Sequence, residues 1–258
     1  MNCFEALIFG LVQGLTEFLP VSSDGHLEIV KYFFGGIEES FLFTVVVHGA
    51  TVLSIIAVFW KEILRLLKGV FKFEMNEETV YSLKIVVSMI PVAIIGFTLR
   101  DQVSSLFVAN MDITGSFLLV TALFLAFGHF VRKREKPITY GGAFVMGIAQ
   151  ALAVLPGWSR SGSTISTGLM LGNSKNELAR FSFLMVIIPI IGANLVEFIT
   201  SEPASVDGVL FPLIVSFIAA FVSGYIACRW MINIVRRGKL GWFALYCLVV
   251  GLSLILFA

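Results

Sequence analysis

The fold is decided by residues 4–26, FEALIFGLVQGLTEFLPVSSDGH, together with a second stretch of the same kind at residues 141–164, GGAFVMGIAQALAVLPGWSRSGST. In both stretches a short apolar segment ends at a proline, Pro20 or Pro156, and a polar cluster follows it. The apolar segments, residues 4–19 and 141–155, fall short of the roughly 20 residues that a helix needs to cross a bilayer. We therefore predict two re-entrant helical hairpins whose polar tips lie at membrane depth, surrounded by protein or by a wet cavity.

The rest of the sequence is typical of a polytopic membrane protein. Hydrophobic residues make up 58% of the 258 residues and charged residues 14%, whereas soluble domains have about 45–50% and about 25%. Six further apolar blocks are long enough to span a bilayer, at residues 41–60, 80–99, 114–131, 181–199, 208–228 and 240–257. The sequence predicts an all-α polytopic membrane protein with six transmembrane helices plus the two hairpins.

The two hairpins match each other at one constant offset in the sequence. The matched residues are Gly10, Gln13, Leu15, Gly25 and Gly35 in the first, and Gly147, Gln150, Leu152, Gly162 and Gly172 in the second. A hairpin returns to its own side of the bilayer and three spans do not, so the second half must be inverted relative to the first. We predict a single membrane domain, residues 1–258, made of inverted-topology repeat halves 1–136 and 137–258, with a site near the midplane where the halves meet.

Basic residues indicate the orientation of this topology. They gather in three segments on one side: Lys61, Arg65, Lys68 and Lys72; Arg132, Lys133, Arg134 and Lys136; and Arg229, Arg236, Arg237 and Lys239. The loop 201–207 on the other side carries only acidic charge. Because cytoplasmic loops carry the excess of Lys and Arg, we expect the basic side to be cytoplasmic and both termini to be outside.

Polar residues that suit phosphate chemistry lie at the first hairpin tip. Gln13 and Glu17 are spaced to share one helix face, and a carboxylate at membrane depth is a functional candidate by default. Ser22 or Ser23 can cap the helix that begins near position 24, which places His26 in its first turn.

The second tip adds the groups that bind anions. Arg160 carries a forked donor that matches phosphate oxygens, and the start of the following helix is a ready anion site. The residues around it are Ser159, Ser161, Gly162, Ser163 and Thr164. Two helix N-termini and an arginine at membrane depth predict a diphosphate with a lipid tail as the ligand.

Residues 13–27 and 156–164 resemble the two signatures of the undecaprenyl-diphosphate phosphatase (bacitracin-resistance) family, and residues 179–183 resemble a further family stretch. The resemblance implies hydrolysis of undecaprenyl diphosphate to the monophosphate and inorganic phosphate, which recycles the lipid carrier of cell-wall synthesis and confers bacitracin resistance. It also implies a bacterial inner (plasma) membrane location, an active site open to the outer face, and a divalent metal, usually Mg or Ca.

Carried over by position, the resemblance implies that Glu17, Ser23, His26 and Arg160 are catalytic, with Glu17 near the metal. The substrate-binding residues that we expect are Gln13, Ser22, Ser159, Ser161, Gly162, Ser163 and Thr164. Gln13 stands where many members have Glu, so this chain departs from a site with two carboxylates. Three nucleophiles remain open: Ser23, His26, and water activated by the metal.

Two other classes of function compete with the phosphatase. Inverted repeats with broken helices are also typical of secondary transporters and lipid flippases, and a lipid-binding scaffold without catalysis is the third hypothesis. The partners that we expect are a polyprenyl diphosphate lipid and membrane lipid, with the monomer and the homodimer both open. A net charge of +1 gives no reason to expect nucleic acid. His48, inside a span, is expected to bond a neighbouring helix.

Overall fold

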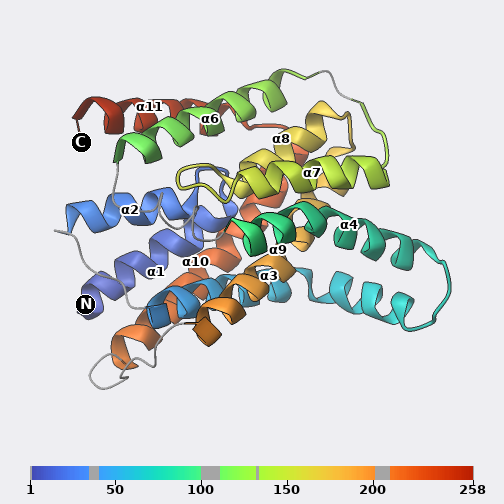
Figure 1. The fold of residues 1–258 in the computed structure, drawn as a ribbon, viewed down its shortest axis with the longest axis horizontal. Coiled ribbons are helices and arrows are strands. Elements are labelled where there is room, and N and C mark those ends of the chain that lie inside the picture. The colour runs from blue at the N-terminus through green and yellow to red at the C-terminus, as the bar shows by residue number, and fades with distance from the viewer. Residues whose placement is uncertain (1, 35–40, 100–110, 132–133, 201–209, 258) are drawn as a thin grey trace.

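The computed structural model describes residues 2–34, 41–99, 111–131, 134–200 and 210–257 (Figure 1). Within these ranges the chain is helical, apart from turns and an isolated bridge between Lys136 and Asn173. The helices are α1 (Cys3–Phe18), α2 (Ser23–Phe33), α3 (Phe41–Val70), α4 (Glu77–Thr98), α6 (Met111–Phe130), α7 (Tyr140–Leu152), α8 (Arg160–Met170), α9 (Lys175–Thr200), α10 (Leu210–Arg237) and α11 (Gly241–Phe257).

Five of the described helices, α3, α4, α6, α9 and α10, are long and apolar enough to cross a membrane. The sixth predicted span corresponds to α11, which is apolar but has only 17 residues. The predicted ends were wrong where a helix continues past its apolar block: α3 runs to Val70 and α10 to Arg237. Those extensions are rich in Leu, Lys, Arg and Ile, and most of these favour helix whether or not lipid surrounds them.

Each of the two segments predicted as hairpins forms a pair of short helices, α1 with α2 and α7 with α8. Their N-caps are Asn2 and Ser22 in the first pair, and Thr139 and Ser159 in the second. Each cap lies at the same offset from its counterpart, and α2 and α8 begin and end at that offset too. α7 ends at Leu152, earlier than the predicted 155, because the chain turns before Pro156.

Close helix packing brings the two hairpins to the centre of the molecule. α1 packs along α10 and α7 packs along α4. At Gly14 a Cβ would collide with Ser223 Oγ and the Ala220 carbonyl oxygen of α10. Small residues at such crossings let helices approach closely, which is how helices associate in membranes. Phe18, at the end of α1, packs edge-on against Phe183 of α9, with ring centroids 6.1 Å apart.

The start of α1 and the end of α11 lie at the same end of the helix bundle (Figure 1). The turn between α3 and α4 and the connection into α7 lie at the opposite end. The predictions for Gly35, Arg132, Lys133, the acidic loop 201–207 and the first residues of the span 208–228 fall outside the described residues.

Candidate active site

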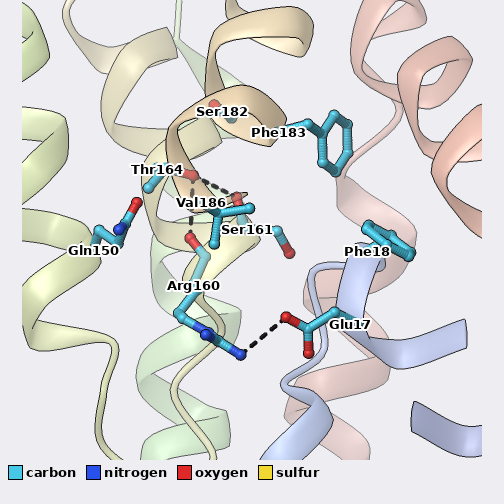
Figure 2. Close-up of a pocket in the computed structure, with 9 residues that line it drawn as sticks. All are labelled: Glu17, Phe18, Gln150, Arg160, Ser161, Thr164, Ser182, Phe183 and Val186. Carbon is cyan, nitrogen blue, oxygen red and sulfur yellow. Dashed lines mark hydrogen bonds and ion pairs between the residues drawn. The ribbon is translucent and has the colours of Figure 1, made fainter. Parts of the chain in front are cut away.

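The tips of the two hairpins meet through an ion pair. Arg160 Nη2, from the first turn of α8, donates to Glu17 Oε1, near the end of α1, at 2.9 Å. Next to this pair, Ser161 Oγ donates to the Leu19 carbonyl oxygen at 3.2 Å. Figure 2 shows the guanidinium of Arg160 directed at the Glu17 carboxylate across the gap between the two hairpins. The fold therefore joins the two polar clusters that the sequence places far apart.

Glu17 is the centre of a network of hydrogen bonds. Its other oxygen, Oε2, accepts from Ser23 Oγ at 2.6 Å and from Gln13 Nε2 at 3.0 Å. The Glu17 side chain is only 4% exposed, whereas that of Arg160 is 22% exposed. A carboxylate buried to this extent is costly unless it is paired and hydrogen-bonded, and here three donors surround it. Gln13, Glu17, Ser23 and Arg160 thus form one unit.

His26 lies in the same tip but bonds to other partners. Ser22 caps α2 with φ at 70°, a left-handed conformation that is uncommon for a serine. Its carbonyl oxygen accepts from His26 N at 3.2 Å and contacts His26 Nδ1 at 2.8 Å. His26 Nε2 lies 2.7 Å from the hydroxyl of Tyr246, on α11. The signatures do not contain Tyr246. The one signal in the sequence that could have identified it as a site residue is its hydroxyl group within an apolar span.

The predicted substrate-binding residues of the second tip are engaged with the protein itself. Ser159 Oγ caps α8 by accepting from Gly162 N at 3.1 Å. Ser163 Oγ accepts from Trp158 Nε1 at 2.7 Å, and Thr164 Oγ1 donates to the Arg160 carbonyl oxygen at 3.1 Å. These contacts fix the first turn of α8, and with it the base of the Arg160 side chain.

A small pocket extends from the ion pair to polar residues that the sequence analysis did not assign to the site. Gln150 of α7 and Ser182 of α9 line it together with Glu17, Arg160 and Thr164 (Figure 2). Both are almost fully buried, and Gln150 Nε2, Gln150 Oε1 and Ser182 Oγ have no hydrogen-bond partner within the described residues. The space open to the centre of a water is about 10 Å³, enough for about one water molecule.

His48 of α3 approaches the site from another side. Its Nδ1 contacts the Thr44 carbonyl oxygen of its own helix at 2.9 Å, so the expected bond to a neighbouring helix is wrong for this atom. Its Nε2 lies 3.9 Å from Asp24 Oδ1, in the first turn of α2. A histidine inside an apolar span was the signal, but its position in the chain does not indicate that it faces the first tip.

The ion pair and the residue next to it carry two oxygen groups of the kind that bind a divalent cation, the Glu17 carboxylate and the Gln13 side-chain oxygen. Gln13 Oε1 is buried without a hydrogen-bond partner among the described residues, next to the Glu17 carboxylate. Carboxylate and amide oxygens are ligands that Mg²⁺ and Ca²⁺ accept. In the described part of the chain no three His, Cys, Asp or Glu residues form a metal-binding group. Phosphate oxygens of a substrate would therefore have to complete the coordination.

Comparison with known proteins gives a consistent result along the whole chain. Residues 6–253 match the family model described as bacitracin resistance protein BacA. A Bacteroides fragilis protein named undecaprenyl-diphosphatase is 54% identical over 97% of this chain and 96% of its own length. A Bacteroides thetaiotaomicron protein of that name is 52% identical over 99% of both chains. A Carboxydothermus hydrogenoformans protein, also so named, is 39% identical over 99% of this chain and 97% of its own.

Proposed function

Because this chain belongs to the bacitracin resistance protein BacA family, we propose that it is an undecaprenyl-diphosphatase whose reaction takes place where its two hairpins meet. It is a multi-pass membrane enzyme that hydrolyses undecaprenyl diphosphate to undecaprenyl phosphate and inorganic phosphate. The product returns to cell-wall synthesis, and removal of the diphosphate deprives bacitracin of its target. The observation that carries the assignment to this site is the Arg160–Glu17 ion pair, held at 2.9 Å with Ser23 bonded to the same carboxylate.

The topology that we propose is an inverted repeat of one hairpin and three spans, counting α11 as the sixth span. The shared spacing of the caps of α1, α2, α7 and α8 supports the repeat. The start of α1 and the end of α11 lie at one end of the bundle, which supports an even number of crossings (Figure 1). The positive-inside rule then puts the α3–α4 turn, with Lys68 and Lys72, on the cytoplasmic side of the plasma membrane, and both termini outside.

In the substrate complex the diphosphate lies between the two tips. Arg160 uses one of its donors for Glu17 in the free protein, and its planar fork can bind two phosphate oxygens. The helices α2 and α8 both begin at this junction, and the N-terminus of each helix attracts negative charge. The prenyl tail would extend along the apolar surface of the neighbouring helices.

Ser23 is the nucleophile that the geometry supports best. Its Oγ donates to Glu17 Oε2 at 2.6 Å, so the carboxylate is in place to take the proton as the oxygen attacks the terminal phosphorus. Undecaprenyl phosphate leaves as the bridging P–O bond breaks. Protonation of Glu17 cancels the charge that held Arg160, which frees the guanidinium to stabilise the phosphate oxygens.

Hydrolysis of the phosphoserine completes the reaction. A water attacks the phosphorus, the bond between phosphorus and Ser23 Oγ breaks, and inorganic phosphate leaves. His26 Nε2 takes one proton from the water, and Ser23 Oγ recovers its proton from Glu17. His26 fits this second step better than the first. Its Nδ1 is directed to the Ser22 carbonyl oxygen, and its Nε2, which points away from that oxygen, is the nitrogen that can take a proton from a water. Direct attack by His26 or by water remains the competing mechanism.

A divalent cation, Mg²⁺ or Ca²⁺, is part of the proposal. Glu17 and the Gln13 side-chain oxygen would hold it together with the phosphate oxygens. Such a cation supplies charge neutralisation at the transferring phosphoryl group.

Phosphate release from undecaprenyl diphosphate by the purified protein in detergent tests the function. Detergent removes the second compartment, so a transporter or a scaffold would release no phosphate. Ser23→Ala should lower kcat by at least about 10²-fold. Ser253→Ala, which removes a hydroxyl that donates to the Val249 carbonyl oxygen of its own helix, α11, should leave kcat unchanged. Normal turnover by the Ser23→Ala variant would exclude Ser23 as the nucleophile. Wild-type protein that releases no phosphate would exclude the phosphatase function.

A further inference from the structure

The last helix contributes a side chain to the site that neither signature contains. The Tyr246 hydroxyl lies 2.7 Å from His26 Nε2, across 220 residues of sequence. The two rings are also stacked, with centroids 5.6 Å apart and planes inclined by 14°. A hydrogen bond and a ring stack between the same two side chains restrain both the position and the rotation of the imidazole.

The direction of this hydrogen bond follows from the other nitrogen of His26. The Ser22 carbonyl oxygen, 2.8 Å from Nδ1, can only accept, so Nδ1 carries a hydrogen. In the neutral imidazole Nε2 is then an acceptor, and the Tyr246 O–H donates to it. Ser22 and Tyr246 together select one tautomer and one ring orientation.

The backbone of α11 is anchored where this contact needs it. Cys247, the next residue, is fully buried, and its Sγ donates to the Pro20 carbonyl oxygen at 3.6 Å, in the turn that joins α1 to α2. The Tyr246 side chain itself is 44% exposed. A fixed backbone with a half-exposed ring allows the hydroxyl to hold His26 and still withdraw when a reacting water takes its place at Nε2.

We propose that Tyr246 is a positioning residue of the phosphatase: its hydroxyl and ring hold His26 in the tautomer and orientation in which Nε2 accepts the proton of the attacking water. The inference rests on the proposed function, because it assigns His26 to the hydrolysis of the phosphoserine. It adds α11 to a site otherwise built from the two hairpins.

The test compares Tyr246→Phe with Tyr225→Phe, in phosphate release and in the ¹⁵N NMR signal of His26 Nε2. Tyr246→Phe keeps the ring and loses the hydroxyl. The control removes a hydroxyl that contacts Arg229 on α10. The His26 signal is identified by its loss in His26→Gln, since the sequence has three histidines.

We expect Tyr246→Phe to lower kcat about tenfold, which corresponds to about 1.4 kcal/mol, with KM unchanged and the Nε2 signal moved. Tyr246→Leu, which also removes the stacked ring, should lower kcat further. The inference is overturned if Tyr246→Phe matches the control in kcat, or if KM rises while kcat stays the same. Wild-type protein that releases no phosphate would instead overturn the proposed function, and the NMR signal would still report whether Tyr246 holds His26.

Discussion

Replacing Arg160 with methionine removes the positive charge that faces Glu17 and leaves a buried carboxylate among uncharged groups. At the observed 2.9 Å, two unit charges attract by about 6 kcal/mol for an effective dielectric constant of about 20. The cost of removing both charges from water offsets much of this attraction. The decisive quantity is the loss of stability when one partner is removed and the other charge stays buried, which is about 3–5 kcal/mol for buried pairs.

The value for this pair should lie near the lower limit, about 3 kcal/mol, because Arg160 is 22% exposed and Glu17 keeps the donors Ser23 and Gln13. In a chain of this size 1 kcal/mol corresponds to about 2–4 °C in Tm. Arg160→Met should therefore lower Tm by about 6–12 °C. The double variant Glu17→Gln with Arg160→Met leaves no unpaired charge, so it should lose less than the sum of the two single variants.

The assay is loss of helical circular dichroism on heating in detergent, for the two single variants and the double variant. The control is Arg65→Met on α3, which breaks the Arg65–Glu62 pair at 2.8 Å and a longer contact to Glu78 at 3.9 Å, with Arg65 56% exposed. A surface pair of this kind contributes about 0.2–1 kcal/mol, so Tm should fall by at most about 4 °C. If Arg160→Met melts no earlier than the control, or if the two single effects simply add, the ion pair does not hold the tips together.

Three further outcomes are expected. Gly14→Ala should destabilise the protein by about 1–3 kcal/mol in heat denaturation, because its Cβ would meet α10, whereas Gly49→Ala, which meets no atom within 4 Å, should be neutral or stabilising. A high-resolution experimental map should contain an ordered water bonded to Gln150 and Ser182, and a dry pocket there would contradict the reading of their unpaired atoms. Removal of divalent cations by a chelator should abolish phosphate release and added Mg²⁺ or Ca²⁺ should restore it; full activity in excess chelator would count against the metal.

The local structure could be predicted because it depends on neighbours in the sequence. A proline after a short apolar segment ends α1, and a serine two residues further on caps α2. A similar pattern recurs in the second segment, where α7 ends four residues before Pro156 and Ser159, three residues after that proline, caps α8. The meeting of Glu17 and Arg160 could be expected once two oppositely directed hairpins were assumed, since a buried carboxylate and a buried guanidinium each need a partner.

The remaining site residues could not be found in this way, because they depend on which helix faces pack together. Tyr246 lies in an apolar segment whose composition does not distinguish the face toward His26 from the face toward lipid. Gln150 was visible only as the counterpart of Gln13 in the repeat, and Val154 stands four residues after it, where Glu17 follows Gln13. The helix ends were missed because hydrophobicity marks the bilayer and not the end of the helix, as α3 shows. The homodimer stays a prediction.

Trp158 gives the second tip an optical reporter of its own. Trp158 lies two residues before Arg160 in the sequence. Its Nε1 donates to Ser163 Oγ, and its ring stacks on that of Phe117. The other three tryptophans, Trp60, Trp230 and Trp242, are each more than half exposed, and their replacement by phenylalanine would leave a single emitter beside the guanidinium. Its fluorescence would then follow the arrival of a lipid diphosphate and the departure of phosphate in real time, without a label.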